Sequence, residues 1–391
     1  MSQVRFLVSI AVGLFTTMTA SLMLAPLLVA IAIEFDTSVA VAGQLATATF
    51  AAWAVSAVSV GPMSDSFGRK PVALTGLSLL SIGVLASAFA PNLGTLMALR
   101  VVTGIGGGMI PPNSLAAVAD SVSPARRAQT VGVLMAITSL SSVISVTLVA
   151  LGADWGGWRL PFLVIGFLLA ACALLNWFWF PKSDGAGIRS FSFFPRYRTL
   201  LAIPDFRSAL AVNLAQRVAF FALFSYLAAY LIDAYDMSVG AVALPLAFVG
   251  MGTAIGSYTG GPVANRKDRM PLIAASAVAG GLAALLLFSI EVPVWVVVAI
   301  ATSAVSLLSV GFPVLLTFST QISGESRATG VGLMGFSNQS GGVGGAALGG
   351  VLLAASGFPG VGYLCLGAVA FSAVMIALFL RQGSPEVVRQ A

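Results

Sequence analysis

The sequence is poor in charge. Asp, Glu, Lys and Arg make up 8% of its 391 residues, whereas hydrophobic residues make up 58%. Because soluble domains carry about a quarter charged residues, a soluble fold of this composition could not cover its own surface. The composition therefore indicates a membrane protein.

Histidine is absent, and cysteine occurs only as Cys172 and Cys365. Both cysteines lie inside apolar runs, so we interpret them as packing residues without a disulfide. The sequence also lacks a G-x-x-x-x-G-K-[ST] phosphate loop, a cluster of metal ligands and a nucleophile–base pair. We expect no enzyme activity, no cofactor or metal, and no nucleotide partner. A membrane scaffold without transport activity is a remote alternative.

The apolar runs are long and continuous, without the alternation of barrel strands. A helix that crosses the bilayer needs about 20 apolar residues, and these runs predict an all-α protein with twelve transmembrane helices. The first run is too long for the core of a signal peptide. The predicted spans are 6–33, 40–62, 72–90, 94–118, 129–151, 160–180, 208–232, 240–262, 271–290, 293–320, 329–355 and 361–380.

The basic residues of the loops predict the orientation, because cytoplasmic loops are enriched in Lys and Arg. With the N-terminus in the cytoplasm, the outer loops hold only Arg159, and Arg100 and Arg217 fall within spans. The inner set is Arg5, Arg69, Lys70, Arg126, Arg127, Lys182, Arg189, Arg196, Arg198, Arg207, Arg266, Lys267, Arg269, Arg327, Arg381 and Arg389. We therefore expect both termini inside a cell membrane, such as the bacterial inner membrane, with anionic lipid rather than nucleic acid facing the basic side.

An internal repeat divides the chain into two halves. Three stretches recur at an offset of 200 residues without gaps, on the same predicted side of the membrane. The pairs are 35–39 with 235–239, 61–71 with 261–271, and 123–132 with 323–332. Such a parallel duplication predicts two six-helix bundles, at 1–180 and 208–391, joined by a cytoplasmic linker at 181–207, with a cavity between them near the midplane.

The loop after the second span, Gly61-Pro-Met-Ser-Asp-Ser-Phe-Gly-Arg-Lys70, resembles the signature loop of the major facilitator superfamily, G-x-x-x-D-x-x-G-R-[KR]. The fourth span adds Leu96-x-x-x-Arg100-x-x-x-Gly104-x-Gly106, which is similar to a motif of the drug:proton antiporter branch with twelve helices. This resemblance covers essentially the whole chain. It implies a monomeric carrier of a small molecule that works by alternating access.

The signature loop predicts a latch at the inner gate. Gly61 leaves room for a close helix approach, and Asp65 is an acid suited to the positive end of a helix. The resemblance implies that this helix starts near Ala328, and that Arg69 pairs with Asp120. The alternative is that Arg69 and Lys70 only anchor the positive inner side, but that reading does not explain Gly61, Asp65 and Gly68 at this spacing.

Two arginines within spans are candidates for the substrate cavity, because a charge inside the membrane is costly and usually faces a wet interior. Arg217 shares a helix face with Asn213, Gln216, Phe220 and Phe224. Arg100 lies inside the helix 4 motif. In each case the alternative is an arginine that snorkels to an interface or bonds backbone carbonyls.

Further polar and aromatic residues are weaker candidates for the cavity. Asn338 and Gln339 either contact substrate or bond between helices, and threonines of the first span often bond their own backbone. This set comprises Tyr226, Tyr230, Asn338, Gln339, Thr16, Thr17 and Thr19.

Two features depart from the antiporter pattern. The fifth span reads Ser139 to Ser145 without the usual glycines and proline, and no carboxylate lies at mid-membrane depth. Asp65 and Asp120 are the only acids near a proton pathway.

The first hypothesis is an exporter of amphipathic or drug-like compounds with possible proton coupling. The alternative is a carrier of an organic anion that uses Arg100 and Arg217.

Overall fold

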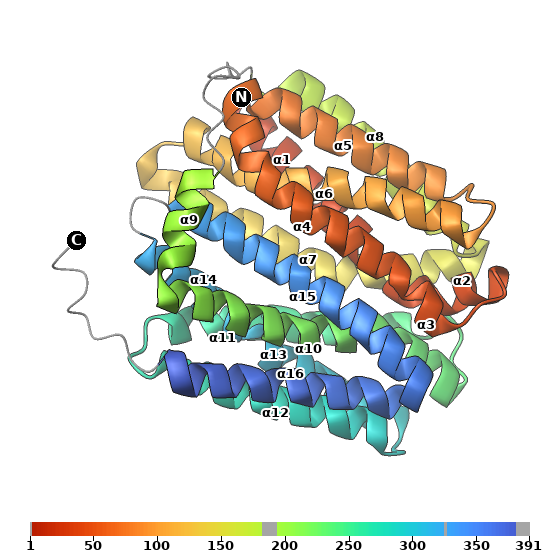
Figure 1. Ribbon diagram of the computed structural model, residues 1–391. Helices are drawn as coiled ribbons and strands as arrows, with labels where there is room; N and C mark the ends of the chain where they lie inside the picture. Colours follow the sequence, from red (N-terminus) through yellow and green to blue (C-terminus); the bar gives the residue numbers. More distant parts are fainter. Residues whose placement is uncertain (1, 182–193, 324–326, 381–391) are drawn as a thin grey trace. The chain divides into compact units, whose positions relative to one another are not determined.

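The computed structural model describes residues 2–181, 194–323 and 327–380, and all regular secondary structure in these ranges is helical (Figure 1). The chain divides into two compact units. Unit 1 comprises Met1–Phe193 and Phe224–Met251, and unit 2 comprises Phe194–Leu223 and Gly252–Ala391. Two long helices, α10 and α11, therefore each contribute to both units.

Each predicted span coincides with one helix or with two or three consecutive helices. The helices of unit 1 are α1 (Ser2–Leu22), η1 (Ala25–Leu27), α2 (Leu28–Glu34), α3 (Val39–Ala42), α4 (Gln44–Phe67), α5 (Arg69–Ser87), α6 (Leu93–Ser121), α7 (Pro124–Gly156) and α8 (Arg159–Trp179). Those of unit 2 are α9 (Phe194–Ala202), α12 (Arg269–Ser289), α13 (Val294–Ser309), α14 (Gly311–Ile322), α15 (Arg327–Ser356) and α16 (Phe358–Phe379). The divided helices are α10 (Pro204–Tyr235) and α11 (Ala243–Ala264).

Ten segments of the described residues are long and apolar enough to cross a membrane. The other two predicted spans are α11 and α15, with 22 and 30 residues. At about 1.5 Å per residue, both are long enough to cross the bilayer core. Their glycines lower the hydropathy without shortening the helix. The prediction of an all-helical, multi-pass membrane protein is confirmed.

Three predicted spans are interrupted. The second is divided at Gly43, between α3 and α4. Proline accounts for the other two interruptions because it has no N–H to donate. The first span changes to a 3₁₀ turn at Ala25–Leu27, which contains Pro26. The tenth is divided at Val310, and Pro313 lies in the first turn of α14. The seventh span begins at Pro204, four residues before the predicted start, because proline and the following Asp205 both favour a helix N-terminus.

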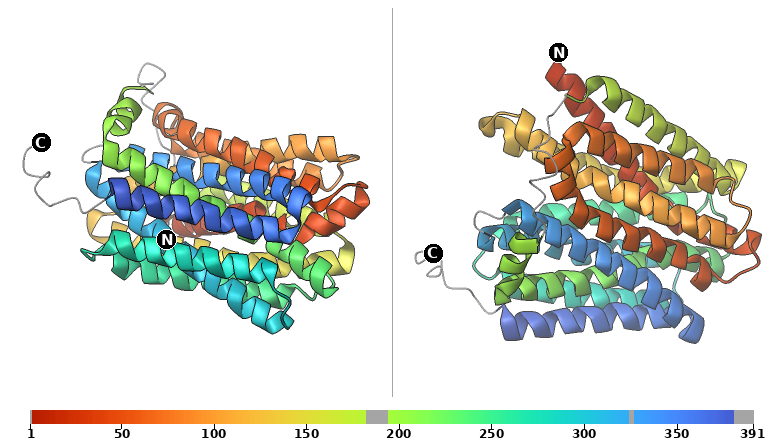
Figure 2. Two further views of the ribbon diagram at one scale, coloured as in Figure 1. Left: turned by 60° about the horizontal axis from the view of Figure 1, so that its bottom comes forward. Right: turned by 45° about the horizontal axis from the view of Figure 1, so that its top comes forward.

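Within unit 2, α12 and α16 pack side by side over most of their length, as Figure 2 shows from two further directions. Two glycines allow this approach from opposite sides. A Cβ at Gly281 of α12 would lie 3.3 Å from the Cα of Leu366, and a Cβ at Gly362 of α16 would lie 2.9 Å from the Cα of Leu285. Close packing of small residues is how helices associate in lipid, where no hydrophobic force draws them together.

The predicted linker at 181–207 contains a helix that sequence patterns did not indicate. In α9, Leu200 is 2% exposed and packs with Phe206 and Leu333 of unit 2. Lys182 and Arg189 of the predicted linker lie outside the described residues. The end of the linker is thus anchored on unit 2 by apolar contacts.

Candidate functional site

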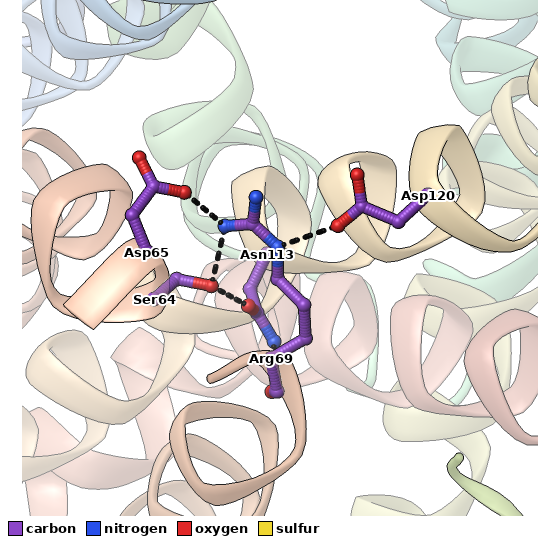
Figure 3. A network of polar contacts seen from close by, with 5 residues as sticks. All are labelled: Ser64, Asp65, Arg69, Asn113 and Asp120. Atoms are coloured by element: carbon purple, nitrogen blue, oxygen red, sulfur yellow. Dashed lines mark hydrogen bonds and ion pairs between the residues drawn. The ribbon is translucent and has the colours of Figure 1, made fainter. Parts of the chain in front are cut away.

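Arg69 is the centre of a polar network at one end of unit 1 (Figure 3). Its Nη1 lies 2.7 Å from Asp65 Oδ1, and its Nε donates a hydrogen bond to Asp120 Oδ2 at 2.9 Å. The arginine therefore joins the end of α4 to the end of α6. The Asp65 and Asp120 side chains are 57% and 58% exposed, and exposed ion pairs contribute only about 0–1 kcal/mol each. The network thus sets geometry more than it adds stability.

Two buried residues that the sequence analysis did not select support this arginine. Arg69 Nη1 also donates to Ser64 Oγ at 2.8 Å, and Ser64 Oγ donates to Asn113 Oδ1 at 2.5 Å. Asn113 Nδ2 in turn donates to the Arg69 backbone oxygen at 2.9 Å. An asparagine inside an apolar run, next to Pro111 and Pro112, is the signal that could have indicated this support, since an unpaired amide is costly in lipid.

Glycines determine the turn that presents Arg69. Gly68 ends α4 with φ 93° and ψ 156°, a conformation that is essentially restricted to glycine. Gly61 lies one helical turn before Asp65, and no described atom lies within 4 Å of a Cβ built on it. The close helix approach at Gly61 and the contact of Asp65 with the start of the eleventh span therefore stay predictions.

In the corresponding loop of unit 2, the arginine has no carboxylate partner among the described residues, and the acid of that loop, Asp268, pairs with Arg266 instead. Arg269 donates to Gln321 Oε1 at 2.9 Å and to the Ala264 backbone oxygen at 2.9 Å, and its guanidinium lies 5.1 Å from the ring centre of Phe318. Asn265 stands where the first loop has Asp65. The two repeats thus hold an arginine at the same place, but only unit 1 surrounds it with carboxylates.

Arg100 is fully buried inside unit 1. Its Nη2 donates to Ser87 Oγ at 2.9 Å and to Thr103 Oγ1 at 2.8 Å, and its guanidinium lies 4.9 Å from the ring centre of Phe162. Its Nε and Nη1 have no hydrogen-bond partner in the described part of the chain. The side chain is therefore held among α5, α6 and α8, inside unit 1.

Arg217 is 6% exposed and lies in the part of α10 that belongs to unit 2. Its Nη2 donates to the Leu308 backbone oxygen at 2.5 Å, while its guanidinium lies 4.7 Å from the ring centre of Phe220 and 5.8 Å from that of Phe312. The ion pairs between described residues do not include this arginine. It is therefore a buried cation held by a carbonyl and two aromatic faces.

Two amides flank Arg217 on the same helix. Asn213 Nδ2 donates to Ser337 Oγ of α15 at 3.0 Å, and Gln216 Nε2 donates to Ser372 Oγ of α16 at 3.0 Å. Both amide side chains are buried. The structure brings Asn213, Gln216, Arg217 and Phe220 together in unit 2 and joins them to α15 and α16.

The other predicted cavity residues are distributed over both units. Asn338 and Gln339 lie next to each other on α15 in unit 2, and Asn338 Nδ2 donates to Gln339 Oε1 at 3.0 Å. Phe224, Tyr226 and Tyr230 are buried in unit 1, with the Tyr226 ring against Gly43. The division of α10 after Leu223 thus separates Phe224 from Asn213, Gln216, Arg217 and Phe220, the residues with which sequence spacing placed it on one face.

The threonines of α1 bond within unit 1. Thr16 lies 3.6 Å from Cys172 Sγ, and Thr19 lies 2.5 Å from Ser145 Oγ. Thr17 Oγ1 is buried and has no hydrogen-bond partner among the described residues. The Thr16–Cys172 pair occupies the positions that Gln216 and Ser372 occupy one repeat later.

The sequence analysis also missed a contact between α7 and the segment before α11. The Gly240 backbone N–H donates to Asp154 Oδ1 at 3.1 Å, and Thr147 Oγ1 donates to the Ala243 backbone oxygen at 3.3 Å. Both contacts join α7 to the segment around the start of α11 within unit 1. An acid near the end of a helix is too common a feature to have indicated this partner.

Comparison with known proteins identifies relatives over much of the chain. The model of the Major Facilitator Superfamily matches residues 10–346. The Bacillus subtilis protein described as an uncharacterized MFS-type transporter, YceJ, is 25% identical over 259 residues, which cover 65% of this chain and 65% of that protein. The gentisate transporter of Corynebacterium glutamicum is 31% identical over 139 residues, or 34% of this chain and 31% of that one. The matched segment thus spans less than two thirds of the length of each of these two relatives.

A solved structure shows the same fold over nearly the whole chain. It is a bacterial homologue of the human lysosomal transporter Spinster, in an inward-facing and unoccupied conformation. The TM-score is 0.77 with 19% identity, and the match covers 98% of this chain and 99% of that one. At this identity the likeness concerns the fold alone.

Proposed function

Because the chain belongs to the major facilitator superfamily, we propose that it is a secondary carrier of an organic carboxylate, for which Arg217 supplies the anchoring charge. The observation that carries the proposal is a buried guanidinium, 6% exposed, that has no acid among its described partners. A charge inside the membrane is costly and typically marks a substrate pathway. A carboxylate would neutralise it and accept a charge-assisted hydrogen bond.

The surroundings of Arg217 favour an aromatic acid over a small inorganic anion. The rings of Phe220 and Phe312 lie against the guanidinium and offer apolar surface beside the charge. Aromatic pairs contribute about 0.5–1.5 kcal/mol beyond the area that they bury. The gentisate transporter among the relatives supports the same substrate class.

Uptake into proteoliposomes tests this proposal. Purified protein is reconstituted, and radiolabelled benzoate is compared with benzylamine, a cation of similar size and shape. We expect Arg217 to be required for benzoate uptake, so Arg217→Gln abolishes it, while Arg217→Lys retains a part because the charge remains without the planar fork. Uptake of benzylamine but not of benzoate would contradict the proposal.

Export of amphipathic compounds is the second candidate function. It is favoured by the aromatic and weakly polar residues of α10, among them Phe224, Tyr226 and Tyr230, which are all buried. Everted vesicles given a lipophilic cation in the medium distinguish the two functions, since an exporter of this kind carries the cation into the vesicles whether or not Arg217 is present.

We make further proposals about the gate, the orientation in the membrane and the oligomeric state. The network of Arg69, Asp65 and Asp120 latches the inner gate, and the two acids are the candidates for any proton coupling. Both termini lie on the cytoplasmic side of a bacterial inner membrane, in keeping with the basic inner loops. The carrier functions as a monomer.

A further inference from the structure

We infer that the substrate carries a hydroxyl group in addition to its carboxylate, and that Asn213 Oδ1 accepts the hydrogen bond from this hydroxyl. The inference rests on the proposed function, because it assigns a second polar contact to the site anchored by Arg217. The observation behind it is that two buried atoms, the acceptor Asn213 Oδ1 and the donor Arg217 Nε, have no hydrogen-bond partner among the described residues. The two residues lie about one helical turn apart on α10.

The orientation of the Asn213 amide is fixed by Ser337. The single hydroxyl proton of Ser337 goes to the Leu210 backbone oxygen at 2.8 Å. Ser337 Oγ can therefore only accept the hydrogen bond from Asn213 at 3.0 Å, which must come from Nδ2. The Asn213 side chain is 0% exposed, and its Oδ1 has no partner among the described residues. The acceptor thus faces away from Ser337, unpaired.

Arg217 provides the complementary group. Its Nη2 is engaged by the Leu308 backbone oxygen, whereas its Nε is buried and lacks a partner in the described ranges. Residues four apart on a helix lie on the same face and are separated by a rise of about 6 Å. Asn213 and Arg217 do not satisfy each other in this structure, so one molecule with an acceptor and a donor could satisfy both.

Because Asn213 Oδ1 and Arg217 Nε are buried, they are expected to select ligands that satisfy both of them. Buried polar groups are nearly always hydrogen-bonded, and an unpaired one marks a bound water, an ion or a ligand. An anion alone would pair Arg217 and leave the Asn213 oxygen unpaired. A site built to bond a hydroxyl also rejects the analogue that lacks it, because the site's own group is then left without a partner. A hydroxy-carboxylate on a rigid ring, such as a hydroxybenzoate, fits both requirements.

The experiment compares matched ligands on the full-length protein. Dissociation constants are measured by calorimetry in detergent for benzoate, 3-hydroxybenzoate, 4-hydroxybenzoate and 4-methoxybenzoate. We expect the better hydroxybenzoate to bind about tenfold more tightly than benzoate, which corresponds to one good hydrogen bond. The 4-methoxy compound has no proton to donate, so it is expected to bind no better than benzoate.

Variants assign the preference to the amide. Asn213→Leu is expected to bring hydroxybenzoate down to the affinity of benzoate while benzoate itself changes little. Ser372→Ala is the matched control, because it removes the serine that holds the other amide of the same helix face, and it should keep the preference for hydroxybenzoate. If Asn213→Leu does not fold, as judged by size exclusion, the comparison of hydroxy and methoxy ligands on the unchanged protein still decides.

The outcomes separate the inference from the proposed function. Benzoate and hydroxybenzoates that bind equally well, in a manner that depends on Arg217, would overturn the inference and leave the carrier of carboxylates standing; a bound water would then account for the Asn213 oxygen. A preference for hydroxyl that survives Asn213→Leu would also overturn it. If none of the carboxylates binds, both the inference and the proposed function fail.

Discussion

Asp36 and Asp236, 200 residues apart, adopt the same uncommon backbone conformation, with φ angles of 48° and 51°. They are the described non-glycine residues with positive φ. Two residues later, Ser38 and Ser238 accept hydrogen bonds from the backbone N–H groups of Val41 and Ala241, at 3.2 and 3.1 Å. The sequence repeat is thus also a repeat of backbone conformation, which supports a common origin for the two halves.

The first prediction concerns these two turns. A left-handed conformation costs a residue with a Cβ about 1–2 kcal/mol, and less for Asp, Asn and Gly. We expect Asp36→Val and Asp236→Val each to lower the melting temperature in detergent, whereas Asp36→Gly and Asp236→Gly leave it unchanged or raise it. The two positions should respond alike. If glycine lowers the melting temperature as much as valine does, the carboxylate rather than the backbone conformation matters there.

The second prediction uses a place where the repeats differ. Gly68 has φ 93°, whereas Asp268, at the equivalent position, has φ −91°. We expect Gly68→Ala to destabilise the protein by about 1–3 kcal/mol, the usual cost of a backbone conformation reserved for glycine. Asp268→Ala, in an ordinary conformation, is the matched control and should cost less than half as much. Thermal unfolding monitored by circular dichroism measures both, and equal losses would contradict the backbone explanation.

The sequence predicted the all-helical, multi-pass architecture because each span has to satisfy its backbone hydrogen bonds in lipid, and that requirement is visible in local composition. The resemblance also indicated the Arg69–Asp120 pair, but not the support of Arg69 by Ser64 and Asn113. It could not predict that α10 divides between two units after Leu223, nor that Arg100 is enclosed by Ser87 and Phe162. Those facts depend on which helices are neighbours, and a hydropathy pattern does not contain that information.

The third prediction tests the latch. Asp65→Asn removes the charge that pairs with Arg69 at 2.7 Å and leaves the Asp120 contact in place. We expect the inner gate to open more often, so that a cysteine introduced at Ser59 on α4 reacts faster with an impermeant maleimide from the cytoplasmic side. The increase is expected to be up to about fivefold, which corresponds to the loss of up to about 1 kcal/mol from one exposed pair. The reporter is built with Cys172 and Cys365 replaced by alanine, although both are buried.

Asp65→Glu is the control for this experiment, since it retains the charge. Labelling at the rate of the parent protein is expected for this variant. A rate that stays unchanged in Asp65→Asn would count against the latch and would leave Arg69 as an anchor of the positive inner side.

The fourth prediction concerns the room that α15 leaves for Arg217. A Cβ at Gly341 would press on the Arg217 Cβ and lie 2.9 Å from the Leu214 backbone oxygen. The obstacle is backbone of α10, which cannot rotate away as the end of a side chain can. We therefore expect Gly341→Ala to displace the arginine, to cost about 1–3 kcal/mol of stability as overpacking does, and to weaken benzoate binding with it.

Gly335 on the same helix provides the matched control for Gly341. No described atom lies within 4 Å of a Cβ built there, so Gly335→Ala adds a methyl group in open space and gains about 0.5–1 kcal/mol of helix propensity. Melting temperature and benzoate affinity should stay the same or rise in this variant and fall together in Gly341→Ala. If Gly341→Ala lowers the melting temperature but leaves benzoate affinity unchanged, the arginine does not depend on this contact for its position, and the binding site must tolerate movement of α15.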